Sequence, residues 1–567
     1  MKLIFRGKLL MVFCIILLQS CTDSKSIKEP AIPTFQNPIF AGFYPDPSVC
    51  KAGDEYYMVH SSFSYFPGLP IFKSRDLVNW EQIGHVMDRS SQLDTEGQGV
   101  SRGLFAPSIT HYKGTFYVTC THIDRVGNFI VKATDPSGPW SEPILLPEVD
   151  GIDPSLFFEE DRAFIVYNSI PPNNESLYDG HRSIRMYELD FERLQVKGEQ
   201  YLLVNGGVDI NEKPVWIEAP HIYHINDYYY LMCAEGGTGY NHSEVVFRSK
   251  DLTGPYVPWD QNPILTQRHL DSARNFPITT TGHADLVEAN GKWWAVFLGC
   301  RPYGDNFYNI GRETFLCPVT WTDDQWPIIN PEFEEVQYSY PTPFGNEVSK
   351  SRFQYTGNFS FTDEFDSSEL ALHYTFLRTP KEKWHQISNG QLTMQLRSET
   401  TSGTGNPSFI GHRQQHHKGI AQTQLTFSPN QENEKAGLVF FQSESNYYYF
   451  CKSTFNNDPV VELYKSQKDG LSLMSRAIIG NEPLYLRVAF NNDQYDFSYA
   501  VGNQPWINWV SGADGTYLST KVAGGFVGTV IGMYATANGE PSGNSASFGS
   551  FTYLGNDDIF NEKNNSN

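Results

Sequence analysis

Basic residues are scarce in this sequence. The 567 residues include 42 Lys and Arg against 64 Asp and Glu, which gives a formal net charge of -22 at pH 7. A protein that binds nucleic acid neutralises phosphates with a basic surface, so the composition argues against a nucleic-acid partner. Hydrophobic residues make up 40% of the chain and charged residues 19%, which favours packed cores over extended disorder.

Long hydrophobic runs are also lacking. The apolar run at residues 9–18 is shorter than the roughly 20 residues that a membrane-spanning helix needs. Lys2, Arg6 and Lys8 precede it, an order that is typical of an export signal. Residues 18–21 end in Cys21 and resemble the lipobox of bacterial lipoproteins, in which the signal is cut before a cysteine that is then lipidated. An ordinary signal peptide with a chance cysteine is the alternative.

The lipobox resemblance implies a location. We expect residues 1–20 to be removed as a signal peptide and residues 21–37 to form a polar tether. The protein is then an exported bacterial lipoprotein of the outer membrane, on its periplasmic or cell-surface face. The lipid on Cys21 would be its only membrane contact.

Cysteine pairs with metal-ligand spacing are absent. The 8 cysteines are scattered without a CxxC motif, and a chain of this length does not need a disulfide framework. The sequence therefore predicts no zinc site and no required cofactor.

Aromatic, glycine and proline residues are abundant. Aromatics make up 14% of the chain, and there are 46 Gly and 34 Pro. This blend favours strands joined by turns over long helices, so we expect an all-β protein.

One short phrase recurs five times along the chain. Each copy is followed, about ten residues on, by a turn signal and aromatic residues, as in a strand-turn-strand unit. The copies are Asp46-Pro47-Ser48-Val49, Ala106-Pro107-Ser108-Ile109, Asp153-Pro154-Ser155-Leu156, Ala219-Pro220-His221-Ile222 and His283-Ala284-Asp285-Leu286.

The spacing of the copies predicts the first domain. Successive copies lie 47 to 66 residues apart, a length that suits four-stranded blades with loop insertions. We therefore predict a five-bladed β-propeller over residues 38–335, with the five phrases around its central axis.

After residue 335 the phrase stops. Residues 336–350 are rich in Tyr, Pro and Gly and are interpreted as a linker. Short alternating strands recur over residues 351–555, the pattern of a β-sandwich or jelly roll. Residues 556–567 are polar, and we expect a flexible tail.

Three of the phrases place an acid at or beside the axis: Asp46, Asp153 and Glu218. A single Asp-Pro is usually part of a turn and has no catalytic role. Three acids that converge on one cavity repel one another, however, and such electrostatic strain usually marks a functional site. Apolar neighbours such as Trp216 and Ala219 are expected to raise the pKa of Glu218. An acid and a base across a cleft are the groups that glycoside hydrolysis needs.

These motifs resemble glycoside hydrolase family 43. Tyr44-Pro45-Asp46-Pro47-Ser48, Ile152-Asp153-Pro154 and Glu218-Ala219-Pro220-His221 match its three acid motifs, and residues 351–555 are similar to the concanavalin-like sandwich of its β-xylosidases. The resemblance implies an inverting enzyme, with Asp46 as general base, Glu218 as general acid and Asp153 as the group that orients Glu218 and raises its pKa.

The resemblance extends to the sugar pocket. Phe63 matches an aromatic residue of the first subsite, Arg312 an arginine that binds sugar hydroxyls, and Phe105 stands where related xylosidases often carry Trp. His283 matches an axial histidine that in some members coordinates calcium or holds a water molecule. Phe526 is expected to reach over the pocket from the second domain.

The implied activity is release of terminal xylose from xylo-oligosaccharides or xylan side structures in the plant cell wall. The first alternative is an α-L-arabinofuranosidase acting on arabinoxylan or arabinan, because the two sugars present similar hydroxyl patterns. The second is a carbohydrate-binding propeller without catalysis. Gly99-Val100-Ser101-Arg102-Gly103 fits the G-x-S-x-G pattern of serine hydrolases, but a strand follows instead of a helix, so we treat the match as chance.

Overall fold

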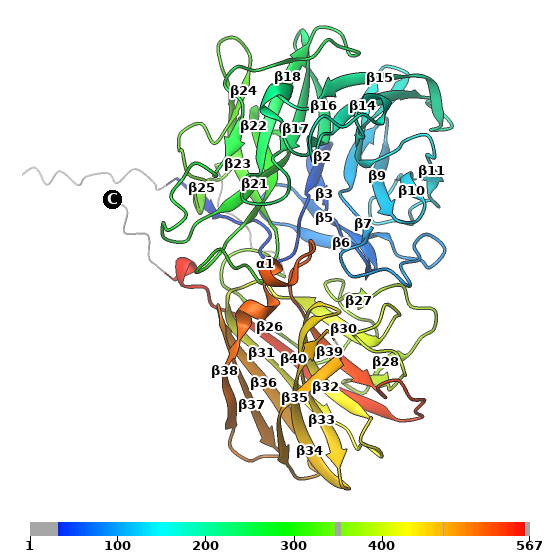
Figure 1. Ribbon diagram of the computed structural model, residues 1–567, viewed down its shortest axis with the longest axis vertical. Helices are drawn as coiled ribbons and strands as arrows, with labels where there is room; N and C mark the ends of the chain where they lie inside the picture. Colours follow the sequence, from blue (N-terminus) through cyan, green and yellow to red (C-terminus); the bar gives the residue numbers. More distant parts are fainter. Residues whose placement is uncertain (1–31, 346–352, 469, 562–567) are drawn as a thin grey trace, which may run out of the picture.

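The computed structural model describes residues 32–345, 353–468 and 470–561, and they form an all-β protein with two bodies of strands (Figure 1). The described part contains one α-helix, the single turn α1 (Thr520–Ala523). No described helix has the length and apolar character needed to cross a bilayer. The predicted signal peptide, Cys21 and residues 346–350 of the predicted linker lie outside the described residues.

The N-terminal body consists of five antiparallel sheets that follow one another along the chain. Each copy of the repeated phrase contributes to a strand of a different sheet, and a turn and an antiparallel partner strand follow it, as the strand-turn-strand pattern predicts. The first sheet contains β2 (Ser48–Ala52), β3 (Glu55–Val59), β5 (Gly68–Ser74) and β6 (Glu81–Met87). The second contains β7 (Gly103–Leu104), β8 (Ser108–Tyr112), β9 (Thr115–Ile123), β10 (Gly127–Ala133) and β11 (Ile144–Leu145).

The remaining three sheets repeat the arrangement. The third contains β12 (Ile152–Glu159), β13 (Arg162–Ser169), β14 (Ser183–Leu189) and β15 (Val196–Asn205). The fourth contains β16 (Glu218–Ile225), β17 (Tyr228–Glu235), β18 (Ser243–Ser249), β19 (Val257–Pro258) and β20 (Leu265–Thr266). The fifth contains β21 (Thr279–Ala289), β22 (Lys292–Cys300), β23 (Glu313–Trp321) and β24 (Pro327–Ile329).

The first strands of the five sheets close into a ring. Each of β2, β8, β12, β16 and β21 contacts the next one, and β21 contacts β2. Ser48 links three sheets at once, because its hydroxyl donates to Asp285 (2.7 Å) and accepts from the backbone N–H of Ile109 (3.0 Å). The ring therefore brings all five phrases to one axis.

The C-terminal body is a sandwich of two antiparallel sheets around a shared core that includes Leu438, Phe450, Val488 and Phe551. One sheet contains β26 (Ser360–Asp363), β28 (His385–Ser388), β29 (Gln391–Gln395), β31 (Lys418–Thr426), β36 (Leu484–Asn491), β37 (Gln494–Val501), β38 (Ile507–Asp514) and β40 (Ser545–Gly555). The other contains β30 (Ser408–Arg413), β32 (Lys435–Ser443), β33 (Asn446–Phe455), β34 (Asp458–Gln467), β35 (Gly470–Ile478) and β39 (Val530–Thr536).

Two segments are more ordered than the sequence suggests. β25 (Ser339–Pro341), within the predicted linker, pairs with β1 (Thr34–Gln36). Asp557, the second residue of the predicted flexible tail, is buried and forms an ion pair with Arg301. Tertiary contacts order these residues, and local composition does not reveal such contacts.

The two bodies are joined by hydrogen bonds and buried charge. β4 (Tyr65–Phe66) pairs with β27 (Phe376–Leu377) across the boundary. Arg301 donates to Glu313 within the N-terminal body (2.7 Å) and to Asp557 from the C-terminal end (2.7 Å), and all three side chains are buried. Arg301 therefore compensates two buried carboxylates at once.

Replacing Arg301 tests how strongly this pairing stabilises the protein. In Arg301→Met the carboxylates of Glu313 and Asp557 stay buried without their cation, so we expect the free energy of unfolding to fall by about 3–5 kcal/mol. Calorimetric unfolding of the whole chain measures the change. Arg75→Met is the control, because Arg75 pairs with Glu55 at an exposed site, where ion pairs contribute little. An equal loss in both variants would contradict the assignment.

Candidate active site

Bulges at the starts of the inner strands turn side chains toward the axis. Asp46, Asp153, Ala219 and His283, at equivalent positions of four phrases, all have left-handed φ values between 51° and 56°. The strand register shifts at three of these places, in β12, β16 and β21. A bulge re-aims the local side chain, and a non-glycine residue keeps a positive φ only where the surroundings hold it there.

Asp46 is buried beside a cation. Arg312 donates to its carboxylate (Nη1 to Oδ1, 2.6 Å), Ser61 donates to the other oxygen (2.5 Å), and His283 Nδ1 lies 3.8 Å away. Burial alone would raise the pKa of Asp46, but the charge of Arg312 and the hydrogen bonds from Ser61 and Arg312 act against burial, and the pKa lies below its ordinary value. Asp46 is therefore held as a carboxylate.

Asp153 and Glu218 are shifted the other way. Burial, followed by the charge of Asp46, raises the pKa of Asp153 to about 7. Burial, then Asp153, then Asp46 raise the pKa of Glu218 well above its ordinary value, and the opposing effect of Arg312 is smaller. The site thus contains one ionised carboxylate and a neighbouring pair that holds protons.

Asp153 also positions the strand that carries Glu218. Its Oδ2 accepts the backbone N–H of Ala219, the residue after Glu218, at 3.2 Å. The hydrogen bond crosses from the third sheet to the fourth. Asp153 therefore acts on Glu218 both through charge and through the backbone.

The three acids line one cavity of about 260 Å³, near the lower end of the ~300–1,000 Å³ usual for ligand pockets. Such a volume suits a small ligand such as one sugar ring. The cavity also contains every side chain that the sequence assigned to the pocket: Phe63, Phe105, His283, Arg312 and Phe526.

Three phenylalanines form an aromatic wall. The ring of Phe526 stacks on Phe63, with centroids 5.9 Å apart and an interplanar angle of 14°, and Phe105 lies 5.5 Å from Phe63. Phe526 comes from the sandwich, and its backbone N–H donates to Ser101 Oγ (3.0 Å). The second body therefore completes the pocket.

Sequence reasoning missed Trp216 and Thr238 as lining residues. Trp216 was considered only as an apolar neighbour of Glu218, but it lies in the cavity wall with the Arg182 guanidinium 3.8 Å above its ring. Thr238 accepts a hydrogen bond from Arg312 (3.2 Å). Trp216 had a sequence signal, its place two residues before the acid, whereas Thr238 had none.

The surroundings of His283 do not fit a calcium cage built by the protein. Burial lowers the pKa of His283 to about 3, so its ring is neutral. Calcium takes about 6–8 oxygen ligands, and no group of three or more His, Cys, Asp or Glu in the described residues is arranged to hold a metal. We therefore derive no step through calcium.

The G-x-S-x-G match has no structural support as a nucleophile. Ser101 lies in a loop before the short strand β7, and no helix follows it. Its hydroxyl instead accepts the N–H of Phe526.

Comparisons with known proteins assign both bodies of the chain to known sequence families. The sequence model described as "Glycosyl hydrolases family 43" matches residues 35–327, and the one described as "Beta xylosidase C-terminal Concanavalin A-like domain" matches residues 362–554. The chain is 37% identical to a xylosidase/arabinosidase of Butyrivibrio fibrisolvens, covering 91% of this chain and 98% of the relative. It is 36% identical to a non-reducing end α-L-arabinofuranosidase of Bacteroides ovatus, covering 92% and 94%.

Solved structures give the same result. The chain resembles the crystal structure of a family 43 protein retrieved from a capybara gut metagenome, with a TM-score of 0.83 and 42% identity. The match covers 90% of this chain and 96% of that one.

Proposed function

The chain belongs to glycosyl hydrolase family 43 and is a glycoside hydrolase, and we propose that it is an inverting exo-glycosidase that releases terminal xylose from xylo-oligosaccharides or xylan side structures. The observation that carries this proposal is the division of charge in one small cavity: Asp46 is paired with Arg312, while Glu218 and Asp153 form no ion pair within the described residues. A cavity of about 260 Å³ with an aromatic wall favours attack at a chain end.

Each acid has a proposed role in one displacement. Asp46 takes a proton from a water molecule while the oxygen of that water forms a bond to the anomeric carbon. The bond from that carbon to the leaving oxygen breaks, and Glu218 gives this oxygen its proton. Asp153 keeps Glu218 protonated until then and holds its strand in place. Attack from the face opposite the leaving group inverts the configuration.

Arabinofuranose is the runner-up substrate. The two curated relatives carry names for both activities at nearly equal identity, 37% and 36%. Phe105 stands in the aromatic wall where related xylosidases often have Trp, and a smaller ring leaves more room beside Phe63. Membership of a hydrolase family favours either enzyme over a binding protein without catalysis.

Two further parts of the assignment are proposals. We infer that the five sheets are the five blades of a propeller, because their first strands close into one ring. The lipid anchor on Cys21 and the outer-membrane location rest on residues 1–21 of the sequence alone.

The proposal is tested with aryl β-D-xylopyranoside and aryl α-L-arabinofuranoside. We expect hydrolysis of the xyloside to dominate and Asp46→Ala to abolish it, because Asp46 is the acid of the cavity whose pKa is lowered, so it is the one held as a base. Release of the aryl alcohol measures the rate. A higher rate on the arabinofuranoside would make arabinofuranose the proposed substrate in place of xylose. Retained activity in Asp46→Ala would contradict the role of Asp46 as the base.

The Glu218→Ala variant tests the role of Glu218 as general acid independently of the role of Asp46 as base. A positioned general acid contributes about 10²–10⁴-fold, so we expect a loss of that size on xylobiose, whose leaving group needs a proton. Dinitrophenolate leaves from dinitrophenyl xyloside without protonation, so the rate of hydrolysis of this substrate should fall little. Equal losses on both substrates would rule out the acid role. Glu212→Gln, exposed on the loop before this strand, is the control.

The pH profile tests the role of Asp153. Activity needs Asp46 ionised and Glu218 protonated, so it falls at low pH through the lowered pKa of Asp46 and at high pH through the raised pKa of Glu218. In Asp153→Asn the amide oxygen still accepts the N–H of Ala219, but the negative charge is gone. The alkaline limb of kcat/KM should therefore move to lower pH.

The control for this profile is Asp161→Asn, on an exposed turn of the same sheet. It should leave both limbs in place. An alkaline limb that does not move in Asp153→Asn would show that Asp153 does not set the pKa of Glu218.

A further inference from the structure

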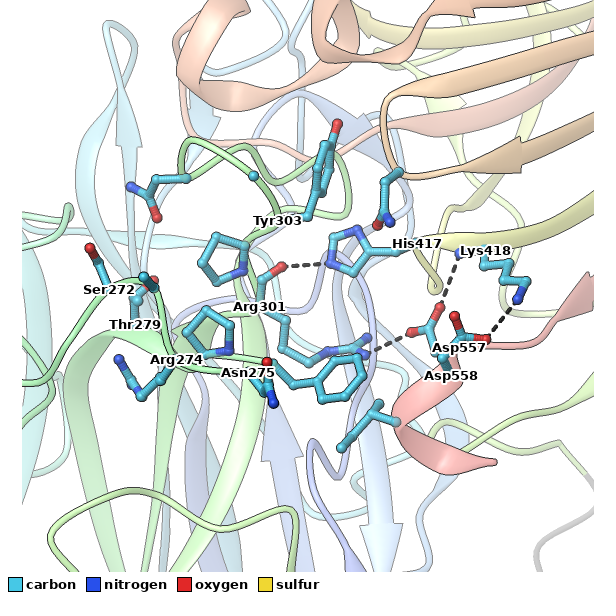
Figure 2. Close-up of a pocket in the computed structure, with 18 of the residues that line it drawn as sticks. Ser272, Arg274, Asn275, Thr279, Arg301, Tyr303, His417, Lys418, Asp557 and Asp558 are labelled. Atoms are coloured by element: carbon cyan, nitrogen blue, oxygen red, sulfur yellow. Dashed lines mark hydrogen bonds and ion pairs between the residues drawn. The ribbon is translucent and has the colours of Figure 1, made fainter. Parts of the chain in front are cut away.

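A larger cavity, of about 690 Å³, lies between the two bodies (Figure 2). Its walls come from the segment before β21, the segment after β22 and the sandwich edge at the start of β31 and the end of β36. It shares no lining residue with the cavity of the three acids. No step of the proposed mechanism uses it.

The cationic groups in its walls are already paired. Arg301 is committed to Glu313 and Asp557, and the Nζ atom of Lys418 lies 2.6 Å from Asp558. Arg274 donates to Glu335 and to backbone carbonyls. An anionic ligand would therefore have to break an existing ion pair to bind.

Most of the groups that remain available are neutral. Besides Asp305, whose carboxylate forms no ion pair within the described residues, the walls offer amide and hydroxyl side chains that make no side-chain hydrogen bond there: Ser272, Asn275, Asn306, Asn491 and Asn492. Amides and hydroxyls both donate and accept, as sugar hydroxyls do.

Two buried atoms of the walls also lack partners within the described part of the chain. Thr279 is 2% exposed, and its Oγ1 has no hydrogen bond. His417 binds the carbonyl of Arg301 through Nε2 (2.5 Å), as Figure 2 shows, while its Nδ1 has no partner. Because Nε2 carries the proton in this contact, Nδ1 is an acceptor. An unpaired buried polar atom is costly, so these positions favour a polar ligand or water.

Aromatic faces stand beside the polar groups. Phe276 is 39% exposed and is held at a φ of 46°, and Tyr303 lies on the opposite segment of the N-terminal wall. An exposed aromatic ring in a polar cavity can pack on an apolar face of a ligand while the amides bind its polar edge.

We propose that this cavity is a second, non-catalytic binding site for a neutral oligosaccharide, which would hold the polymer while the acid pocket acts on a chain end. That the oligosaccharide is built of pentoses rests on the proposed function, whereas the existence of the binding site rests only on the residues that line the cavity. The volume of 690 Å³ accommodates more than the single sugar ring that suits the smaller cavity.

The test is a calorimetric titration with xylohexaose and with arabinohexaose, in a Glu218→Gln background that suppresses turnover. We expect two binding events per chain. Adding Phe276→Ala and Asn491→Ala, singly and together, should weaken one event about ten-fold or more and leave the other unchanged. Phe333→Ala and Asn503→Ala are matched controls, an exposed Phe and an exposed Asn outside the cavity.

The outcomes are distinct. One binding event in the parent, or two events unaffected by the cavity substitutions, would overturn the proposal. Sedimentation that shows a dimer lost on substitution, without sugar binding, would make the cavity an interface between copies and would also overturn it. Aryl glycoside kinetics of Phe276→Ala in the otherwise native chain should be unchanged. Absence of aryl glycoside turnover in the native chain would refute the proposed function and leave the titration valid.

Discussion

The active site depends on one guanidinium among three crowded carboxylates. Buried like charges cannot all remain ionised, so the carboxylate that lies directly against a guanidinium keeps its charge. Both Nη groups of Arg312 donate to Asp46, the nearer at 2.6 Å, and its other hydrogen bonds within the described residues go to Thr238 and to the carbonyl of Phe526. Asp46 therefore keeps its charge, while burial, reinforced by that charge, raises the pKa of the other two acids. The difference between base and acid is produced by geometry from chemically similar groups.

The sandwich is part of this geometry. The segment before Arg312 is tied to it, because Tyr308 N–H donates to Ser519 (2.9 Å) and Asn309 donates to the carbonyl of Gly515 (2.9 Å). Gly311 approaches the sandwich so closely that an added Cβ would lie 2.9 Å from the backbone nitrogen of Gly528. Its φ of 77° also requires glycine. The same sandwich segment supplies Phe526, so one contact region places both the cation and part of the aromatic wall.

Much of the active site could be predicted from the sequence, because the repeated phrase marks equivalent positions in the five sheets. Five copies of one phrase predicted five equivalent strand starts, and the acids within them were therefore expected to converge. Phe526 could be assigned only through the family resemblance, since nothing local marks a residue that reaches its site across a domain boundary. Trp216 and Thr238 were missed for a related reason: loops, and not the repeated phrase, bring them to the cavity. The order of Asp557 was missed because its partner, Arg301, lies 256 residues earlier in the chain.

Residues 301–312 connect the two cavities. Arg301 lies in the wall of the larger cavity and binds both bodies, while Arg312, at the other end, holds Asp46. Between them the segment is anchored to the sandwich by Tyr308 and Asn309, so its ends cannot move far independently. Here the interface fixes the cation on which the acid–base difference depends, and the larger cavity opens along the same segment.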